Sequence, residues 1–293
     1  KLNPTNNGFN KNLQIIKENI NTIMSLNIIN SNVLENKIDN KKYVFSNKNV
    51  ISKDLILENF DQIIIPKNAK ILLTDDADII IKNSKIDFNG TDYNKITVSA
   101  IGNSNSSIYF DNSQVNINYT HFQNLRNLDK KAWMLPAAIT FHKSKVIINS
   151  SSFVSNTYGD DYLNFFNCKS VTVTDSSFEN VYSDAIDSDF STIEISNSIF
   201  QNIKNDGVDV SGSNLEISNS IFQNVSDKAI SVGEKSYAIA KNNKIFNSEM
   251  GIVIKDGSSM IDIDSEYFNN TFDIVMFIKK SYFGAGNIVS KNV

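Results

Sequence analysis

A period of 22 residues runs through the second half of the chain. The phrase ISNSIFQN occurs at 195–202 and again at 217–224, which places Phe200 and Phe222 22 residues apart. Phe178 precedes Phe200 by the same interval, and Phe246 and Phe268 extend the series at spacings of 24 and 22. A repeat of this length, built from short β-branched runs and turns of Asn, Ser, Gly and Asp, is typical of a solenoid.

Each repeat contains three short stretches in which apolar residues alternate. One repeat shows them as Val208 with Val210, Leu215 with Ile217, and Ile221 with Phe222. No apolar run is long enough for a crossover helix. Three short strands per turn predict an all-β fold, a right-handed parallel β-helix solenoid. Because equivalent residues of successive turns then lie about 4.8 Å apart, a residue type that recurs with the period forms a row on the surface.

The first 45 residues have a different pattern. Between residues 9 and 27 the apolar residues fall on one helical face; they are Leu13, Ile16, Ile20, Ile23 and Met24. We expect this amphipathic helix to cap the open end of the first coil, whose unpaired backbone groups invite aggregation. The expected organisation is a tail and capping helix over residues 1–45 and one β-helix domain over residues 46–293.

Two further segments depart from the period. The interval between Phe122 and Phe153 grows to 31 residues, and the inserted residues include Trp133, the single tryptophan. We expect this insertion to form one wall of a groove. Residues 279–293 lose the pattern and are expected to close the far end of the solenoid.

Composition excludes several classes of protein. The formal net charge of −4, without a basic face, argues against a nucleic-acid partner. One cysteine, Cys168, permits no intrachain disulfide, and no apolar stretch approaches the roughly 20 residues of a membrane span. The chain begins at Lys1 rather than Met, so we expect that an upstream segment has been removed and that the protein acts outside the cytoplasm, as a secreted, periplasmic or cell-surface protein.

Aligning the first strand of each turn places polar side chains in rows. The expected inward residues are Ile139, Leu163, Ile186, Val208, Ile230, Ile252 and Ile274. The next residues, which face outward, are Thr140, Asn164, Asp187, Asp209, Ser231, Val253 and Val275. Two positions further on lie His142, Phe166, Asp189, Ser211 and Gly233, and the preceding turn carries Asp161, Asp184, Asp206 and Lys228. These rows predict an acidic patch three turns tall.

The electrostatic repulsion between stacked carboxylates must be compensated. Two like charges about 5 Å apart repel by on the order of 1 kcal/mol in water and several at an effective dielectric near 20, which applies to Asp187 above Asp209 and to Asp184 above Asp206. A bound cation, Lys228 or a raised carboxyl pKa would each relieve this repulsion. Oxygen ligands converging from several turns suit Ca²⁺, whereas a carboxyl group with a raised pKa suits a general acid.

Turn capping is the alternative interpretation for part of the patch. Aspartate at a tight turn often bonds its own backbone, which accounts for Asp184, Asp206 and Asp227. It accounts less well for Asp187, Asp189 and Asp209, which fall in mid-strand, where aspartate is disfavoured. By the same reasoning we expect structural roles for two other rows. These are an internal hydrogen-bonded ladder of Asn180, Asn202 and Asn224, and a core stack of Phe178, Phe200, Phe222 and Phe246.

From about Val50 to Ile278 the sequence resembles the right-handed β-helix proteins of the pectate-lyase-like superfamily. The phrases SDAID at 183–187, NDGVD at 205–209 and DKAISVG at 227–233 follow one another in an order similar to the aspartate phrases of polygalacturonase-type glycoside hydrolases. NDGVD also resembles the SDDGWD-like phrase of calcium-dependent polysaccharide lyases that use a lysine base. Either resemblance implies an acidic polysaccharide as substrate.

Three functions follow as hypotheses. The first is a lyase that acts by β-elimination on a uronate-containing polysaccharide, with Ca²⁺ on Asp184, Asp187, Asp206 and Asp209 and with Lys228 as the base. The second is a glycoside hydrolase that uses paired aspartates. The third is a non-catalytic extracellular module that binds glycan or serves as a structural spacer.

The candidate residues divide by role. The catalytic candidates are Lys228, Asp209, Asp187 and His142, and the candidates for substrate binding are Asn164, Asp189, Asp161, Trp133 and Ser231. The protein is expected to act as a monomer or a homotrimer.

Overall fold

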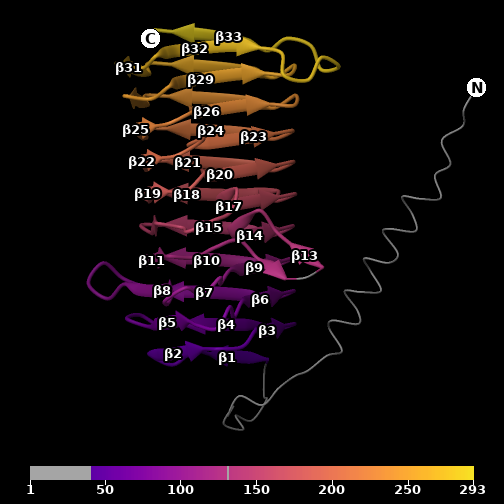
Figure 1. Cartoon of the computed structure of the whole chain (residues 1–293), viewed down its shortest axis with the longest axis vertical. Helices are drawn as coiled ribbons and strands as arrows, with labels where there is room; N and C mark the ends of the chain where they lie inside the picture. The colour runs from indigo at the N-terminus through magenta and orange to yellow at the C-terminus, as the bar shows by residue number, and fades with distance from the viewer. Residues whose placement is uncertain (1–40, 131) are drawn as a thin grey trace, which may run out of the picture. The chain divides into compact units, whose positions relative to one another are not determined.

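The computed structural model describes residues 41–130 and 132–293, and this part of the chain forms one coil of parallel β-strands with no helix. Each turn contributes one strand to each of three parallel sheets, here called A, B and C, in the order A, B, C along the chain. Figure 1 shows the turns stacked one above another from β1 to β33. The predicted parallel β-helix is therefore confirmed, whereas the expected capping helix lies outside the described residues.

The strands of sheet A are β1 (Lys42–Val44), β4 (Gln62–Ile65), β7 (Lys85–Asn89), β10 (Gln114–Asn118), β15 (Lys145–Asn149), β18 (Ser170–Thr174), β21 (Thr192–Ser196), β24 (Asn214–Ser218), β27 (Tyr237–Lys241), β30 (Ser259–Ile263) and β33 (Asn287–Lys291). Those of sheet B are β2 (Lys48–Ile51), β5 (Lys70–Leu73), β8 (Ile96–Ala100), β11 (Thr120–Gln123), β16 (Ser152–Val154), β19 (Ser177–Val181), β22 (Ile199–Ile203), β25 (Ile221–Val225), β28 (Lys244–Phe246) and β31 (Glu266–Phe268). Those of sheet C are β3 (Leu55–Glu58), β6 (Ile79–Lys82), β9 (Ile108–Asp111), β14 (Ala137–His142), β17 (Asp161–Phe166), β20 (Asp184–Asp189), β23 (Val208–Ser211), β26 (Lys228–Gly233), β29 (Met250–Lys255) and β32 (Phe272–Phe277).

The repeated Asn-Ser pairs form one set of corners. Asn197, Asn219 and Asn242 adopt a left-handed backbone with φ of 50°, 50° and 54°, a conformation that Asn tolerates better than most residues. The residues that follow them, Ser198, Ser220 and Asn243, are buried. Each turn's backbone donates to the next turn's side chain: Ser176 N to Ser198 Oγ at 3.3 Å, Ser198 N to Ser220 Oγ at 3.2 Å, and Ser220 N to Asn243 Oδ1 at 3.0 Å. Buried polar groups at the corners are thereby satisfied.

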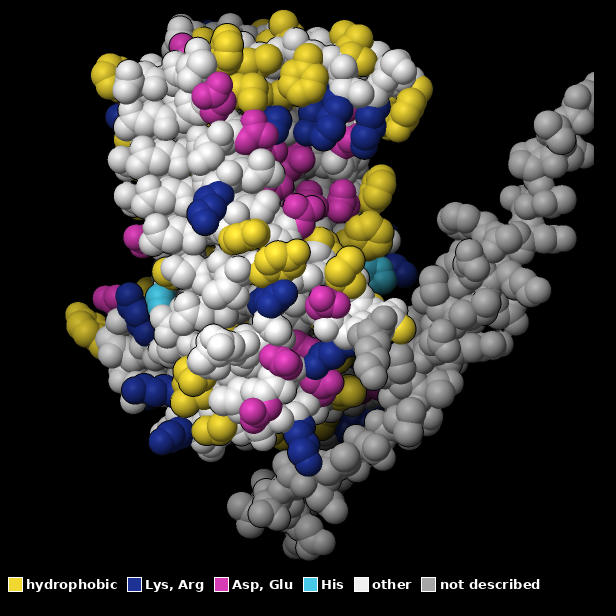
Figure 2. Space-filling model, viewed as in Figure 1, with side chains coloured by type: hydrophobic (Ala, Val, Ile, Leu, Met, Phe, Trp, Pro, Cys, Tyr) yellow, Lys and Arg dark blue, Asp and Glu magenta, His cyan; other side chains and the backbone are white. Residues whose placement is uncertain are grey.

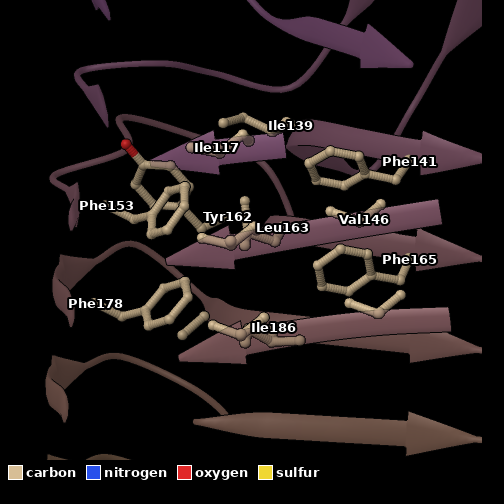
Figure 3. Packing of buried hydrophobic residues seen from close by; sticks show 14 of the residues in the cluster. Ile117, Ile139, Phe141, Val146, Phe153, Tyr162, Leu163, Phe165, Phe178 and Ile186 are labelled. Atoms are coloured by element: carbon tan, nitrogen blue, oxygen red, sulfur yellow. The ribbon is translucent and has the colours of Figure 1, made fainter. Parts of the chain in front are cut away.

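Aromatic rings stack through the core under sheet B. Phe122, Phe153, Phe178, Phe200 and Phe222 follow one another with ring centroids 4.5–5.2 Å apart and nearly parallel planes. Figure 3 shows Phe153 above Phe178, beside a second stack that contains Phe141 and Phe165. These rings fill the interior between the sheets and fix the vertical spacing of the turns.

Phe246 was wrongly predicted to belong to the core stack. Phe222 pairs with Ile245, and Phe246 pairs with Gln223 instead, so its ring lies on the outer side of sheet B and is only half-buried. The reason is that the corner between β26 and β27 carries one extra residue, whereas the 24-residue spacing of the phenylalanines implied two, so the inward position is 245 and not 246.

The Asn ladder is present, but at the surface rather than inside. Asn202 donates to Asn180 at 3.2 Å and Asn224 donates to Asn202 at 2.9 Å, and all three residues have φ near 55°. Sheet A also extends further than expected at both ends. β1 lies before the boundary placed at residue 46, and β33 continues the pattern within residues 279–293, after a loop that Figure 1 shows beside β32.

The insertion between Phe122 and Phe153 forms a short antiparallel hairpin at the corner between sheets B and C, made of β12 (Asp129–Lys130) and β13 (Trp133–Met134). Lys130 of this hairpin reaches Asp54 at 3.1 Å and the buried Asp78 at 3.0 Å. Burial raises the pKa of Asp78, and Lys130 opposes that rise. The hairpin is thus held to the outer side of sheet C by an ion pair.

Candidate functional site

The acidic patch lies on the outer face of sheet C. Asn164, Asp187, Asp209 and Ser231 occupy directly paired positions of β17, β20, β23 and β26, as the sequence predicted. Asp187 and Asp209 are both half-buried and face outward, because the strands alternate between buried and partly exposed residues. Figure 2 shows acidic side chains gathered on one face, with hydrophobic side chains beside and below them and basic side chains above.

A second row of carboxylates lies at the start of the same strands and is buried. Asp161, Asp184 and Asp206 have exposures of 1%, 7% and 2%. Asp184 Oδ1 accepts the backbone N–H of Asp206 at 2.9 Å and the amide of Asn205 at 2.6 Å. Asp206 Oδ1 likewise accepts the backbone N–H of Lys228 at 3.1 Å. Asp184 and Asp206 therefore cap the following turn and not their own, which corrects the simple turn-capping interpretation. Asp161 Oδ2 is buried without a hydrogen-bond partner.

Burial and mutual repulsion raise the carboxyl pKa values. Burial, followed by the charge of Asp206, raises the pKa of Asp184 to about 7. Burial and the charge of Asp209 raise the pKa of Asp206 to about 6, although Lys228 opposes the rise. Burial, then the charges of Asp189 and Asp209, raise the pKa of Asp187 well above 3.8, while Asn164 donates to Asp187 Oδ2 at 3.0 Å. The patch therefore retains protons near neutral pH.

Lys228 is held at the edge of this patch by two carboxylates. Its ammonium group contacts Asp206 Oδ1 at 3.1 Å and also pairs with Asp227. Burial lowers the pKa of Lys228, but these two partners outweigh burial, and the net effect is a raised pKa. Lys228 is thus an ammonium group in an ion-pair network and not a free amine.

Lys255 is a second lysine in the patch, and the sequence interpretation missed it. It ends β29, is only 2% exposed, and contacts Ser231 Oγ at 2.9 Å and Asp209 Oδ1 at 3.4 Å. The available signal was its spacing, because Lys255 follows Gly233 by 22 residues and so continues the row of Asp189 and Ser211.

Among the described residues, the carboxylates of Asp184, Asp206 and Asp209 form a group that could hold a metal ion, with ligand atoms within 4.8 Å of one another. Asp187, the fourth predicted ligand, is not part of this group. The donors already present compete with a cation: Lys228 pairs with Asp206, and Lys255 pairs with Asp209. Ca²⁺ takes six to eight oxygen ligands, so it would have to displace both ammonium groups, and the residues as placed do not fit a resident Ca²⁺.

The other predicted site residues lie around the aspartates. Asn164 and Ser231 flank Asp187 and Asp209 in the same row, and both are buried; Asn164 contacts Asp187 and Ser231 contacts Lys255. His142 is in the predicted row with Asp189 but two turns before it, where its Nδ1 pairs with Asp111 Oδ1 at 2.8 Å. The structure therefore does not bring His142 to the carboxylates.

Trp133 also lies away from the carboxylates. Its ring makes an edge-to-face contact with Tyr109, at a centroid distance of 5.2 Å. Tyr109 belongs to the row that continues through Thr140 and Asn164 to Asp187, and it lies three turns before Asp187. Trp133, in contact with Tyr109, is therefore well separated from the carboxylates along the coil.

A surface groove of about 730 Å³ follows the corner between sheets B and C, beside the buried aspartates. Tyr158 and Tyr182, which are 49% and 42% exposed, line it one above the other with centroids 5.6 Å apart. Met134 of the inserted hairpin and Lys204 lie along it as well. The insertion thus contributes to a groove wall as predicted, but through Met134 rather than Trp133.

Exposed rings also border the patch at the opposite corner, between sheets C and A. Phe166 and Phe190 are 41% and 64% exposed and make an edge-to-face contact at 6.0 Å. The carboxylates of β20 and β23 are thus flanked by aromatic side chains at both corners of sheet C, an arrangement that can hold a long, partly apolar ligand across the strands.

The stacked turns and the outward rows define the class of protein: a right-handed parallel β-helix. Residues 161–293 match the family model described as "Right handed beta helix region". No curated protein sequence matches the chain.

Several solved structures share the fold at low identity. The catalytic domain of a GH87 alpha-1,3-glucanase variant in complex with tetrasaccharides is 10% identical, with a TM-score of 0.41 over 86% of this chain and 64% of that domain, so the chain spans less than two thirds of it. PfbA, a surface adhesin of Streptococcus pneumoniae, is 13% identical, with a TM-score of 0.39 over 82% of this chain and 86% of the adhesin. An alginate lyase from Paenibacillus sp. str. FPU-7 is 13% identical, with a TM-score of 0.39 over 79% of this chain and 91% of the lyase. These similarities concern the fold alone.

In the part of the chain that the structure describes, no helix is long and apolar enough to cross a membrane.

Proposed function

We propose that the protein is an extracytoplasmic glycoside hydrolase that cleaves a polysaccharide lying across sheet C, with Asp187 as general acid and Asp209 as general base. The observation that carries the proposal is the direct pairing of these two half-buried carboxyl groups on adjacent strands. Pairs of carboxyl groups in different electrostatic environments are the usual catalytic groups of glycoside hydrolysis.

The environments of the two carboxyl groups differ in the required direction. The raised pKa of Asp187 keeps a proton available for the glycosidic oxygen of the leaving sugar. Asp209 instead lies beside the ammonium group of Lys255, at 3.4 Å, which neutralises the negative charge of the carboxylate. A water molecule that attacks the anomeric carbon would give its proton to Asp209.

The groove supplies the binding surface. Tyr158 and Tyr182 present exposed rings beside the carboxylates, and sugar rings pack well on aromatic side chains because these are apolar bodies with polar edges. Six carboxyl groups, Asp161, Asp184, Asp187, Asp189, Asp206 and Asp209, face two ammonium groups in the patch. This excess of acid favours a neutral polysaccharide over the uronate chain that the resemblance implies.

The calcium-dependent lyase is a second candidate, and the group of Asp184, Asp206 and Asp209 is the observation in its favour. Against it stands Lys228, whose ion pairs and raised pKa keep it protonated and unable to accept the C5 proton of a uronate. A non-catalytic glycan-binding module is the third candidate, supported by the groove alone.

One experiment separates the three candidates. The protein is incubated with neutral and uronate polysaccharides, with and without chelator, and new reducing ends and the absorbance of unsaturated products are measured. We expect reducing ends without unsaturated product, unaffected by chelator, and a loss of at least about 10²-fold in Asp187→Asn and Asp209→Asn.

The matched control is Glu216→Gln. Glu194 and Glu216 are paired on adjacent strands of sheet A in the same way as Asp187 and Asp209 on sheet C, so the control removes one of two stacked carboxylates on another face and should leave turnover unchanged. Unsaturated product that disappears with chelator would establish the lyase instead, and binding without turnover would establish the module.

A further inference from the structure

Lys255 takes an unusual path to its partners. It ends β29, and the pairing of Val232 with Ile254 places it directly beside Gly233 of β26. Its Nζ nevertheless reaches Ser231 Oγ at 2.9 Å and both carboxylate oxygens of Asp209 at 3.4 and 3.5 Å, and Asp209 lies 46 residues earlier, two turns away. The side chain therefore runs over the adjacent strand and not outward into solvent.

Gly233 makes this path available. A Cβ atom at position 233 would lie 2.6 Å from Lys255 Cε, closer than Cβ atoms approach a neighbour, and 3.3 Å from Lys255 Cγ, so the lysine side chain would have to shift. Gly233 is not among the glycines with positive φ, so its backbone conformation does not itself require glycine. The close approach of the lysine is the physical reason for a glycine here.

Because the ammonium group of Lys255 is buried, it needs a hydrogen-bonded acidic partner, and that partner is Asp209. The side chain of Lys255 is 3% exposed and that of Asp209 is 22% exposed, and a buried ammonium group is costly without a hydrogen-bonded partner. Glu234 is a second acidic side chain on which the charge of Lys255 acts, but it pairs with Lys280 and accepts a hydrogen bond from Ser211. Asp209 and Ser231 are therefore the groups that hold the ammonium.

We propose that Lys255 is a positioning residue: it fixes the Asp209 carboxylate against Ser231 and acts as its built-in counter-charge, in the place that a divalent cation takes in a metal-dependent acidic site. Because Gly233 has no side chain, it leaves the space through which the Lys255 side chain reaches Asp209. This inference rests on the proposed function in so far as Asp209 is the base, but the interaction of the lysine with the acidic patch is independent of any substrate.

The substrate-independent test uses Ca²⁺ alone as the probe. Chelator-treated wild type, Lys255→Met and Gly233→Ala are titrated with Ca²⁺ by calorimetry. Because an ammonium group within about 5 Å repels a cation, and does so more strongly where water is partly excluded, we expect Lys255→Met and Gly233→Ala to bind Ca²⁺ at least about tenfold more tightly than wild type. Equal affinity in wild type and Lys255→Met, or no binding by either, would overturn the proposal even if the protein proves to be a hydrolase.

The kinetic test separates positioning from a general loss of stability. In Gly233→Ala and in Lys255→Met we expect kcat to fall about 10²-fold with KM within about threefold, since a misplaced base impairs the chemical step more than binding. The double variant should be no worse than either single variant, because both changes act through the same side chain.

Lys241→Met, on sheet A, is the control and should keep full activity and the Ca²⁺ affinity of wild type. Independent losses that multiply in the double variant, or a change confined to KM, would contradict the assigned role. Absence of turnover by wild type would overturn the proposed function only, because the Ca²⁺ titration still decides the role of Lys255. If Gly233→Ala fails to fold, Lys255→Met alone carries the test.

Discussion

Replacing Asp184 with asparagine should stabilise the protein at neutral and alkaline pH. Asp184 is 7% exposed, and burial together with Asp206 raises its pKa to about 7, from an ordinary value of 3.8. Between these values the unfolded chain has released a proton that the folded protein still holds. The stability of the wild type therefore falls as pH rises from about 4 to about 7, and the loss is complete above both pKa values.

The magnitude follows from the two pKa values. One pKa unit corresponds to about 1.4 kcal/mol, so the difference between about 7 and 3.8 corresponds to about 4 kcal/mol. Asp184→Asn removes the charge but keeps an oxygen that can accept the N–H of Asp206, now 2.9 Å away. Because part of the raised pKa depends on the charge of Asp206, we expect a gain of about 2–4 kcal/mol at pH 8 and almost none near pH 4.

The assay is urea unfolding followed by circular dichroism at pH 4 and pH 8, in the presence of chelator so that no cation can relieve the repulsion. Asp175→Asn is the matched control, since Asp175 is an exposed carboxyl group at a corner with φ of 49°; its effect should be the same at both pH values. Equal unfolding midpoints for wild type and Asp184→Asn at pH 8, or a difference that does not change with pH, would refute the argument.

Three further predictions concern the stack, the ladder and the groove. Phe200→Ala should lower the free energy of unfolding by about 3–5 kcal/mol, because Phe200 is fully buried between two rings. Phe246→Ala, outside the stack, should lower it much less. Similar losses for the two variants in urea unfolding would contradict the assigned packing. Asn202→Ala should lower the melting temperature more than Asn202→Gly, since φ at this position is 56° and a left-handed backbone costs an alanine about 1–2 kcal/mol. Tyr182→Ala should weaken oligosaccharide binding about tenfold in calorimetry. Tyr237 is equally exposed but lies on sheet A, so Tyr237→Ala should leave binding unchanged. Equal effects of the two substitutions would exclude the groove as the binding surface.

The sequence alone determined the fold and the register of the acidic rows. A strict period makes residues 22 apart vertical neighbours, so Phe200 above Phe222 and Asp187 above Asp209 followed directly from counting. Counting failed where a turn changed length, because a single residue more or less moves a strand's inward position by one, which is how Ile245 took the place expected for Phe246.

The tertiary structure decided which side chains meet across turns. A period places the Cα atom of Lys255 beside Gly233, but it does not give the direction of a long side chain, and Lys255 reaches back two turns to Asp209. The three-dimensional structure also buried Asp161, Asp184 and Asp206 and left Asp187 and Asp209 partly exposed, so that only the second pair can meet a ligand at the surface. The physical reason is that burial and electrostatic environment depend on all neighbouring turns and corners together, whereas the repeat fixes only the position of each residue along its own row.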